Sequence, residues 1–510
     1  MKRKTGNRML TTGLVLAMTA GMFAGCGNSA PAAATDNASA DTETLAETSE
    51  TAAVQETAKT DNGEVPTLIW WTVGGTPADD FDQAISEISD YAEEKIGVRI
   101  DVKIAGWADY DTKMNNIVNT GEYFDLMFVN NTNYSKFVNL NALENITDLV
   151  QSETPDLYGF IPQELWDGVK IHNNVYAVPT YKDSSMTQFW MLDDTYVQKY
   201  NIDVEGIKDF ATLNDALQTI KEGEGKSVYP MKLAQGSTFN GFFNGYDDLA
   251  GGVSAIGVWY EDEERKVVSL LEQDDVKEKL NWLHKWYQDG IINPDANVVT
   301  DGGKGSIFGS AQGWPAAATT WAFNQGIEKY DLTQVFGPLY TTETIQGSMN
   351  AISANSKYKT EALKVLQLMN TDPKFRDMCA YGTEGNYMEY AEDGTVQKLR
   401  DDWNWPSYTQ GTFFILSTQA DGDPDAWNQV KEQNESAVSS TCLGFALDVT
   451  NIQNEIANCN TVWDKYKNDL LTGASDPATA VPACIEELKA AGLDTVIEEA
   501  QKQVDEFFAN

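Results

Sequence analysis

The sequence is poor in histidine and in basic residues. Two histidines among 510 residues leave little provision for histidine-based acid–base catalysis or for histidine-rich metal sites. The 36 Lys and Arg residues are outnumbered by 77 Asp and Glu residues, for a net charge of −41. Binding to nucleic acid depends on basic patches, so this charge argues against that partner. It favours a soluble protein that self-repulsion keeps monomeric.

Signatures of the common enzyme and metal-binding classes are also missing. The chain has no GxSxG, HExxH, CxxC or Walker motif, and the Gly-rich run GGKGSIFG is incomplete as a phosphate loop. We therefore predict neither a catalytic residue nor a cofactor nor a metal. Besides Cys26, four cysteines lie near the C-terminus, and we expect buried thiols or one disulfide from them: Cys379, Cys442, Cys459 and Cys484.

Residues 1–25 are typical of a bacterial lipoprotein signal peptide. The basic start MKRKTGNRM precedes an apolar run, LTTGLVLAMTAGMFA, that is too short to cross a bilayer. Ala24 and Gly25 then precede Cys26, as in a lipobox, although Phe23 stands where leucine is preferred. We predict that Cys26 carries a lipid anchor on the extracellular face of the cell membrane. An ordinary signal peptide followed by a chance cysteine is the alternative.

Residues 26–65 form a different segment. They contain no aromatic residue and consist largely of Ala, Thr, Ser, Asp and Glu. Such a composition cannot bury enough apolar surface to fold. We therefore predict a disordered acidic tether between the membrane and the folded part of the chain.

From residue 66 onward, strand and helix patterns alternate, which predicts an α/β fold. In such folds, ligands bind beyond the carboxyl ends of the strands. The expected strands are 67–73, 97–105, 124–130 and 175–183, with a hairpin over 257–270. The expected helices are 79–95, 109–119, 210–222, 274–288 and 360–369, with a mostly helical tail from 437. Two further strands, at 335–340 and 349–353, are expected to return to the first part of the fold.

Several segments resemble one protein family. They are the lipobox, the acidic tether, YAVPT, DGIINPDAN and the stretch from Asn355 to Tyr390. Together they resemble an extracellular solute-binding lipoprotein of an ABC importer, family 1-like, in the subgroup with a DUF3502-type C-terminal region related to LipO-like lipoproteins. One departure is Asn386-Tyr387-Met388, where the family usually has a His-Tyr-like pair.

The resemblance implies a non-enzymatic protein with a two-lobed, periplasmic-binding-protein-like clamp (type II-like). Its discontinuous lobes would be joined by a hinge and would close on a carbohydrate, often an oligosaccharide, that is delivered to an ABC permease. On this reading, the N-terminal lobe comprises residues 66–179 and about 315–370. The C-terminal lobe comprises residues 180–314 and about 371–510.

Sugars present C–H faces that pack on aromatic rings and hydroxyls that need hydrogen-bonding partners. Because neighbouring residues of a strand point to opposite faces, we predict that one of Trp70 and Trp71 is core and the other, with Trp71 favoured, lines the cleft. Trp403 and Trp405 are expected to share a face of an extended segment. The remaining candidates lie at strand ends, near the hinge or in the family motif: Trp107, Asn130, Asn131, Tyr134, Tyr181, Lys182, Asp183, Trp314, Trp321, Glu384 and Tyr387.

Three alternatives remain open. A cell-surface glycoside hydrolase would need two carboxylates facing each other across a cleft, and among 77 acidic residues some pair can always be nominated. The second alternative is a binder of a peptide or another non-sugar solute. An amino acid ligand would need an Arg or Lys against its carboxylate, and few cations lie in the candidate segments. A calcium loop from Asp421 to Glu432 is the third, but it lacks its central glycine, and a helix start near Asp423 is the simpler account.

Overall fold

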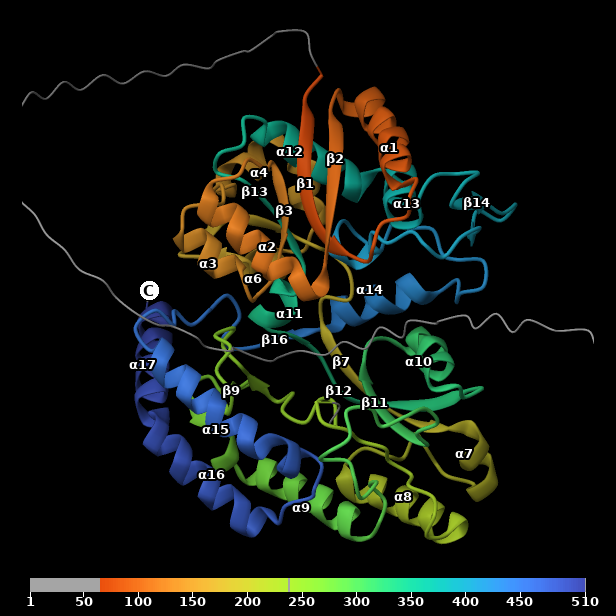
Figure 1. Ribbon diagram of the computed structural model, residues 1–510, viewed down its shortest axis with the longest axis vertical. Helices are drawn as coiled ribbons and strands as arrows, with labels where there is room; N and C mark the ends of the chain where they lie inside the picture. Colours follow the sequence, from red (N-terminus) through yellow and green to blue (C-terminus); the bar gives the residue numbers. More distant parts are fainter. Residues whose placement is uncertain (1–64, 237–238, 510) are drawn as a thin grey trace, which may run out of the picture. The chain divides into compact units, whose positions relative to one another are not determined.

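The computed structural model describes residues 65–236 and 239–509 (Figure 1). The signal peptide, the lipidation site Cys26 and all but the last residue of the predicted tether lie outside the described residues. Among the described helices, none is both long and apolar enough to cross a membrane. The buried apolar side chains form two large cores, which define two lobes.

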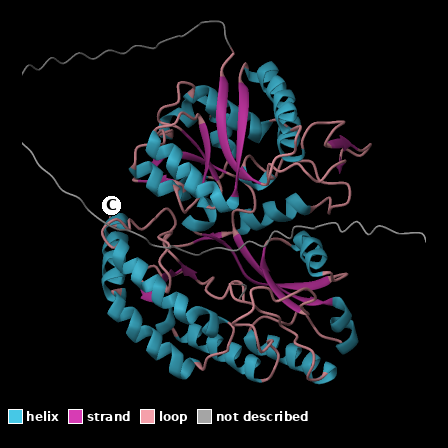
Figure 2. Ribbon diagram, in the orientation of Figure 1, coloured by secondary structure: helices cyan, strands magenta, loops and turns pink. Residues whose placement is uncertain are grey.

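The first lobe is built on a five-stranded sheet with the order β2-β1-β3-β13-β6. Strands β1 (Thr67–Gly74), β2 (Arg99–Gly106) and β3 (Leu126–Val129) run parallel, whereas β13 (Met349–Ile352) lies antiparallel to β3 and β6 (Ala177–Pro179). Helices surround this sheet (Figure 2), which explains why β3 is apolar along its whole length.

The helices of the first lobe come from two stretches of the chain. They are α1 (Phe81–Ile96), α2 (Trp107–Thr120), α3 (Tyr134–Asn139), α4 (Thr147–Glu153), α5 (Pro155–Phe160), α6 (Gln163–Gly168), α11 (Thr342–Gln346), α12 (Lys359–Thr371) and α13 (Pro373–Tyr381). Two short hairpins accompany them: β4 (Lys170–Ile171) with β5 (Asn174–Val175), and β14 (Met388–Tyr390) with β15 (Val396–Lys398).

The second lobe contains a four-stranded sheet with the order β11-β7-β12-β16. Its strands are β7 (Met186–Asp193), β11 (Phe308–Gln312), β12 (Tyr330–Tyr340) and β16 (Val438–Ser439). A smaller sheet comprises β8 (Tyr246–Asp247), β9 (Ile256–Trp259) and β10 (Val268–Ser269). The helices are α7 (Asp194–Tyr200), α8 (Phe210–Glu224), α9 (Asp274–Gln288), α10 (Ala318–Gln325), α15 (Gln453–Leu471), α16 (Pro477–Ala491) and α17 (Leu493–Phe508). A further helix, α14 (Ala426–Ser436), lies between the lobes, where it contacts β12 of the second lobe and hydrogen-bonds Ser185 between β6 and β7.

Local sequence explains why several of these helices begin and end where they do. Asp209 caps α8 by accepting a hydrogen bond from the Thr212 backbone, 2.7 Å away, and Leu213, Leu217 and Ile220 form its buried stripe. The predicted helix over 274–288 coincides with α9. The hairpin predicted over 257–270 is present as β9 and β10.

The chain passes between the two lobes three times. The first crossing joins β6 to β7 over residues 180–185, and the second joins β12 to α11 at Thr341. The third follows α14 into β16, which pairs in parallel with the end of β12. These three crossings are the only covalent links between the lobes in the described part of the chain, and together they make the hinge.

The lobe boundaries differ from those expected from the sequence in two places. Strand β12 pairs with β7 in the second lobe, so only β13 of the two expected returning strands joins the first sheet. Residues 373–405 pack into the first core rather than the second, with Phe375 and Trp405 fully buried there. Short apolar strands do not specify their sheet by sequence, because either sheet buries them equally well.

The four cysteines in the described part of the chain are buried free thiols: Cys379, Cys442, Cys459 and Cys484. Burial raises the pKa of Cys442 and Cys484 to about 12, so both are protonated and unreactive at neutral pH. Of the two possibilities expected from sequence, the structure has buried thiols and not a disulfide.

Candidate ligand-binding site

The parallel strands of the first lobe end together at one edge of their sheet. Gly74 of β1 pairs with Gly106 of β2, and β3 lies on the other side of β1. Trp107 follows β2 directly, and Asn130 and Asn131 follow β3. This edge therefore gathers three of the predicted site residues, as expected for the ligand side of an α/β sheet.

An exposed aromatic pair stands at this edge. Trp107 and Tyr408 stack with ring centroids 6.4 Å apart and an interplanar angle of 19°. They remain 48% and 43% exposed, although Phe128 supports the indole edge-on from below at 6.1 Å. The Ser348 hydroxyl lies 2.8 Å from the Tyr408 carbonyl oxygen and 2.9 Å from the Thr180 hydroxyl, which places the pair beside the first crossing. Large exposed aromatic side chains next to a hinge make this edge the candidate for ligand contact.

Tyr408 was not predicted, whereas its neighbours Trp403 and Trp405 were. The prediction is wrong for both tryptophans, because neither presents an open ring face. Trp405 is fully buried edge-on against Trp70 at 5.3 Å, and Trp403 donates its indole N–H to the Cys379 carbonyl at 3.0 Å. The only local signal near Tyr408 is Pro406, which precedes a short turn over Ser407–Thr409 but does not show what the turn contacts.

The expectation that Trp70 and Trp71 have different roles is also wrong. Trp70 is fully buried and donates to Asn350 Oδ1 at 3.1 Å. Trp71 is only 9% exposed, and the Lys113 ammonium covers its ring at 4.1 Å. Alternation does place the two on opposite faces, but helices cover both faces of this sheet, so both indoles are core.

The two glycines after these tryptophans accommodate another segment of the chain. A Cβ atom at Gly74 would lie 2.3 Å from the Asn404 carbonyl oxygen, and Gly75 donates its backbone N–H to that oxygen at 3.1 Å. The glycine pair therefore docks residues 403–406 on the end of β1. That docking places Tyr408 next to Trp107.

Polar groups from both lobes meet next to the end of β3. Asn131 donates to Glu343 Oε1 at 3.0 Å, and Glu343 on α11 hydrogen-bonds the Asp248 carboxyl of the second lobe. Burial raises the pKa of Asp248 well above its usual value, and the nearby Glu343 carboxyl raises it further. Burial and this neighbouring carboxyl group therefore both disfavour the charged form of Asp248.

The other residues predicted near the end of β3 have structural roles. Asn130 accepts a hydrogen bond from the Thr132 backbone N–H at 3.0 Å, as in an Asx-turn. Tyr134 is fully buried and donates its hydroxyl to the Val169 carbonyl at 2.7 Å. The structure therefore contradicts Tyr134 as a ligand contact and leaves Asn130 as a half-buried turn residue.

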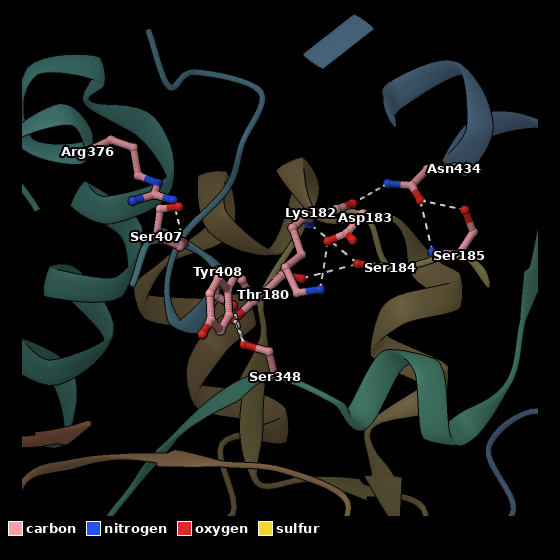
Figure 3. A network of polar contacts seen from close by, with 10 residues as sticks. All are labelled: Thr180, Lys182, Asp183, Ser184, Ser185, Ser348, Arg376, Ser407, Tyr408 and Asn434. Carbon is pink, nitrogen blue, oxygen red and sulfur yellow. Dashed lines mark hydrogen bonds and ion pairs between the residues drawn. The ribbon is translucent and has the colours of Figure 1, made fainter. Parts of the chain in front are cut away.

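The residues predicted at the hinge lie on the first crossing, where Figure 3 shows Lys182 and Asp183. Tyr181 is 6% exposed and packs edge-on against Phe414 at 4.4 Å, and burial raises its pKa to about 12. The Lys182 ammonium and the Asp183 carboxylate pair at 2.8 Å, both half-buried. Tyr181 is thus a packing residue, whereas Lys182 and Asp183 are already paired with each other.

In the second lobe, Trp314 and Trp321 lie on either side of the short segment that leads into α10. Trp314 is 6.2 Å from Trp427 of α14, and its buried indole N–H has no acceptor among the described residues. Trp321 packs against Phe189 at 6.2 Å and lies so close to Gly313 that a Cβ there would be 2.8 Å from the indole. Both rings are half-buried, so they line the lobe without forming a free platform.

A second group of partly exposed aromatic residues was missed by sequence reasoning. Trp259 is 38% exposed and lies 5.2 Å from Tyr260, which in turn packs edge-on against Phe336 at 5.6 Å. The Tyr260 carbonyl accepts from the Thr441 backbone N–H at 2.9 Å, next to the third crossing. The sequence did contain a signal for this group, because Trp259 and Tyr260 are adjacent in the predicted hairpin. A two-stranded hairpin has too little surface to bury both side chains.

The two residues predicted from the family motif do not face this region. Tyr387 is buried and donates its hydroxyl to Asp80 at 2.6 Å, and the Arg400 guanidinium holds the same carboxylate at 2.7 Å. Hydrogen bonds from Arg400 and Tyr387 hold the pKa of Asp80 far below its usual value. Glu384 is exposed, with its nearest cation, Lys374, at 3.6 Å. This motif therefore braces the first lobe at the start of α1.

The described residues offer no cluster of three or more His, Cys, Asp or Glu side chains placed to hold a metal ion. In the segment considered for calcium, Asp423 accepts from the Asp425 backbone N–H at 2.9 Å and from the Gln429 side chain at 3.0 Å. These bonds precede α14, which begins at Ala426. The segment is therefore a helix start, two residues later than expected.

The chain matches two family models. Residues 87–398 match the family described as bacterial extracellular solute-binding protein, and residues 441–509 match a domain of unknown function, DUF3502. A carbohydrate ABC transporter substrate-binding protein of Streptococcus pneumoniae serotype 4 is 28% identical over 465 residues, which cover 88% of this chain and 92% of that protein.

Solved structures show the same likeness. The N-glycan transport solute-binding protein NgtS of Streptococcus pneumoniae is 27% identical, with a TM-score of 0.78, over 87% of this chain and 99% of that one. The structure of NgtS in complex with Man5GlcNAc has the same identity and coverage and a TM-score of 0.65. The two-lobed α/β fold and a family match over more than half of the chain lead to one conclusion: the chain belongs to the bacterial extracellular solute-binding protein family, whose members bind their cargo without transforming it.

Proposed function

We propose that this protein captures an oligosaccharide between its two lobes and delivers it to an ABC permease at the outer face of the cell membrane. The observation that carries the proposal is the stacked and exposed pair Trp107–Tyr408. It lies at the carboxyl-end edge of the first sheet, next to the hinge. Relatives that match the chain over most of its length include a carbohydrate ABC transporter substrate-binding protein and an N-glycan transport solute-binding protein.

The chemistry of this edge suits a neutral sugar. The exposed rings of Trp107 and Tyr408 offer an apolar face for sugar C–H groups. Asn131, Glu343 and Asp248 supply an amide and two carboxyl groups that can exchange their mutual bonds for hydroxyl groups of a ligand. The cation in the first crossing, Lys182, is already paired, which disfavours a ligand chosen for its carboxylate.

Aromatic residues of both lobes flank the hinge, and this arrangement supports a closing mechanism. Trp107 and Tyr408 lie beside the first crossing, and Tyr260 lies beside the third. A ligand that contacts both groups stabilises the closed state, because those contacts exist together only after closure.

Calorimetry of the full-length protein with Man5GlcNAc, a fructo-oligosaccharide and a mixed-sequence peptide tests the proposal. We expect a glycan to bind and to be recovered uncleaved, and Trp107→Ala to weaken that binding. Trp282→Ala, a half-buried tryptophan on α9, is the matched control and should bind normally. Cleavage of the glycan would indicate a hydrolase, and binding of the peptide alone would indicate a different cargo.

The membrane attachment is a separate part of the proposal and rests on the sequence around Cys26. A diacylglycerol on this cysteine would keep the protein close to its permease while the acidic tether allows it to move. Cys26→Ser should release the protein from the membrane fraction of the cells that express it. Retention of that variant on membranes would contradict lipid anchoring at this residue.

A further inference from the structure

Tyr408 lies on a short segment whose backbone is held by side chains from two other elements (Figure 3). Arg376 of α13 donates from Nη2 to the Ser407 carbonyl at 2.8 Å and from Nε to the Thr412 carbonyl at 2.7 Å. Ser348, just before β13, lies 2.8 Å from the Tyr408 carbonyl oxygen. The backbone on both sides of the exposed ring is therefore fixed by buried groups, since Arg376 is fully buried and Ser348 is 4% exposed.

The hydrogen bonds of Ser348 have a defined direction. Its Oγ is within hydrogen-bond distance of both the Tyr408 carbonyl oxygen and the Thr180 hydroxyl, at 2.8 and 2.9 Å. A serine hydroxyl has one proton, and a carbonyl oxygen can only accept. The Ser348 proton therefore goes to Tyr408, and the Thr180 hydroxyl supplies the proton between the two side chains. Ser348 thus links the aromatic pair to the first residue of the first crossing.

From Thr180, further hydrogen bonds continue along the hinge. The Thr180 carbonyl accepts from the Ser184 hydroxyl at 3.2 Å. The Asn434 side chain on α14 accepts from both the backbone N–H and the hydroxyl of Ser185, and it donates to the Lys182 carbonyl. The end of α14 leads into the third crossing, so the network that begins at Tyr408 reaches two of the three crossings.

We propose that Ser348 is a positioning residue for ligand binding: it holds Tyr408 against Trp107 and joins this pair to the hinge. The inference rests on the proposed function, because it takes the Trp107–Tyr408 pair as the ligand-contacting surface. Ser348 does not itself reach that surface, since it is only 4% exposed and its one hydroxyl proton goes to Tyr408. We assign the effect of its loss on ligand affinity to Tyr408 and not to its bond with Thr180 alone.

A double-mutant cycle tests this dependence. With Man5GlcNAc as the probe, Ser348→Ala should weaken binding about 3- to 10-fold, the usual effect of one lost hydrogen bond. In a Tyr408→Ala background the same change should have no further effect. Ser89→Ala is the matched control, because Ser89 is equally buried and bonds the Ile100 backbone in the same lobe. Equal fold-losses from Ser348→Ala in both backgrounds would overturn the proposal.

A second measurement needs no ligand and separates this inference from the proposed function. Tetranitromethane nitrates exposed tyrosines, and the rate at Tyr408 can be followed by mass spectrometry of its peptide. In Ser348→Ala the Tyr408 backbone loses one of the bonds that hold the ring beside Trp107, so the nitration of Tyr408 should be several-fold faster, whereas Ser89→Ala should match the wild type. An unchanged rate in Ser348→Ala would overturn the positioning role even if glycans bind. A faster rate with no glycan binding in any variant would support the role and reject the proposed cargo.

Discussion

At the scale of single residues, exposure separates a tryptophan that is available to a ligand from those that pack in the core. Trp107→Ala should weaken glycan binding about 10-fold, roughly 1.4 kcal/mol, because the indole offers a stacking face that is 48% exposed. Its effect on the free energy of unfolding should stay small for the same reason. Calorimetry and urea denaturation of one variant measure both quantities.

Trp70→Ala should behave in the opposite way. Its indole is fully buried, packed on Trp405 and hydrogen-bonded to Asn350, so truncation should cost about 3–5 kcal/mol of unfolding free energy. Glycan affinity measured on the folded fraction should be unchanged. A large loss of affinity without loss of stability would contradict the packing role of Trp70.

Asp247 gives a pH-dependent prediction. It is 1% exposed, and burial, with the neighbouring Asp248 carboxyl, raises its pKa to about 6. An unfolded aspartate titrates near pH 3.9, so the folded protein keeps this proton to higher pH. The stability that the group contributes is therefore complete below about pH 4 and is lost as the pH rises through about 6.

Asp247→Asn should remove this dependence. Between pH 4 and pH 7 the variant should gain about 3 kcal/mol in unfolding free energy relative to the wild type, which corresponds to two pKa units. Urea denaturation at both pH values gives the difference, and exposed Asp79→Asn serves as the control. If the difference in unfolding free energy between wild type and variant does not change with pH, Asp247 is ionised in the folded protein at neutral pH, which would contradict this prediction.

Residue by residue, the sequence predicted the strand end that carries Trp107 and Asn131 but not which aromatic rings stay exposed. Exposure depends on distant segments: Trp405 covers Trp70, and the 403–406 segment lies on Gly74. Such contacts join positions more than 300 residues apart, so local periodicity cannot show them. Tyr408 was missed for this reason, since only the docked segment brings it to Trp107.

At the scale of secondary-structure elements, the end of β1 and the 403–406 segment form one unit. Gly74→Ala would place a Cβ atom 2.3 Å from the Asn404 carbonyl oxygen, so the segment must shift. We expect a loss of about 1–3 kcal/mol in unfolding free energy and faster amide hydrogen exchange over 403–410. Gly106→Ala is the control, because a Cβ there has nothing within 4 Å. Equal exchange in both variants would show that the segment does not depend on Gly74.

Element boundaries were largely predictable, whereas sheet membership was not. The apolar pattern of residues 274–288 predicted both ends of α9 correctly. A regular apolar stripe and a glycine just beyond its last residue are enough to define a single helix. Strand β12 was assigned to the wrong lobe, because an apolar strand near a hinge can extend either sheet. Its pairing with β7 in the structure depends on non-local hydrogen bonds.

At the scale of the whole molecule, two cores joined by three crossings predict closure around the ligand. Binding of Man5GlcNAc should reduce the radius of gyration in small-angle X-ray scattering, because only a closed form brings both aromatic groups onto one ligand. The Trp107→Ala variant should need more glycan to reach the same reduction. Binding without any change in the radius of gyration would indicate that the ligand is held by one lobe.

The central claim is that an oligosaccharide stacks on the Trp107–Tyr408 pair between the lobes. A crystal structure of the protein with Man5GlcNAc, or with whichever glycan binds in calorimetry, tests it most directly. The account predicts a sugar ring in contact with both Trp107 and Tyr408 and hydroxyl groups within hydrogen-bond distance of Asn131 or Glu343. A glycan bound elsewhere, with this pair still exposed to solvent, would contradict the account.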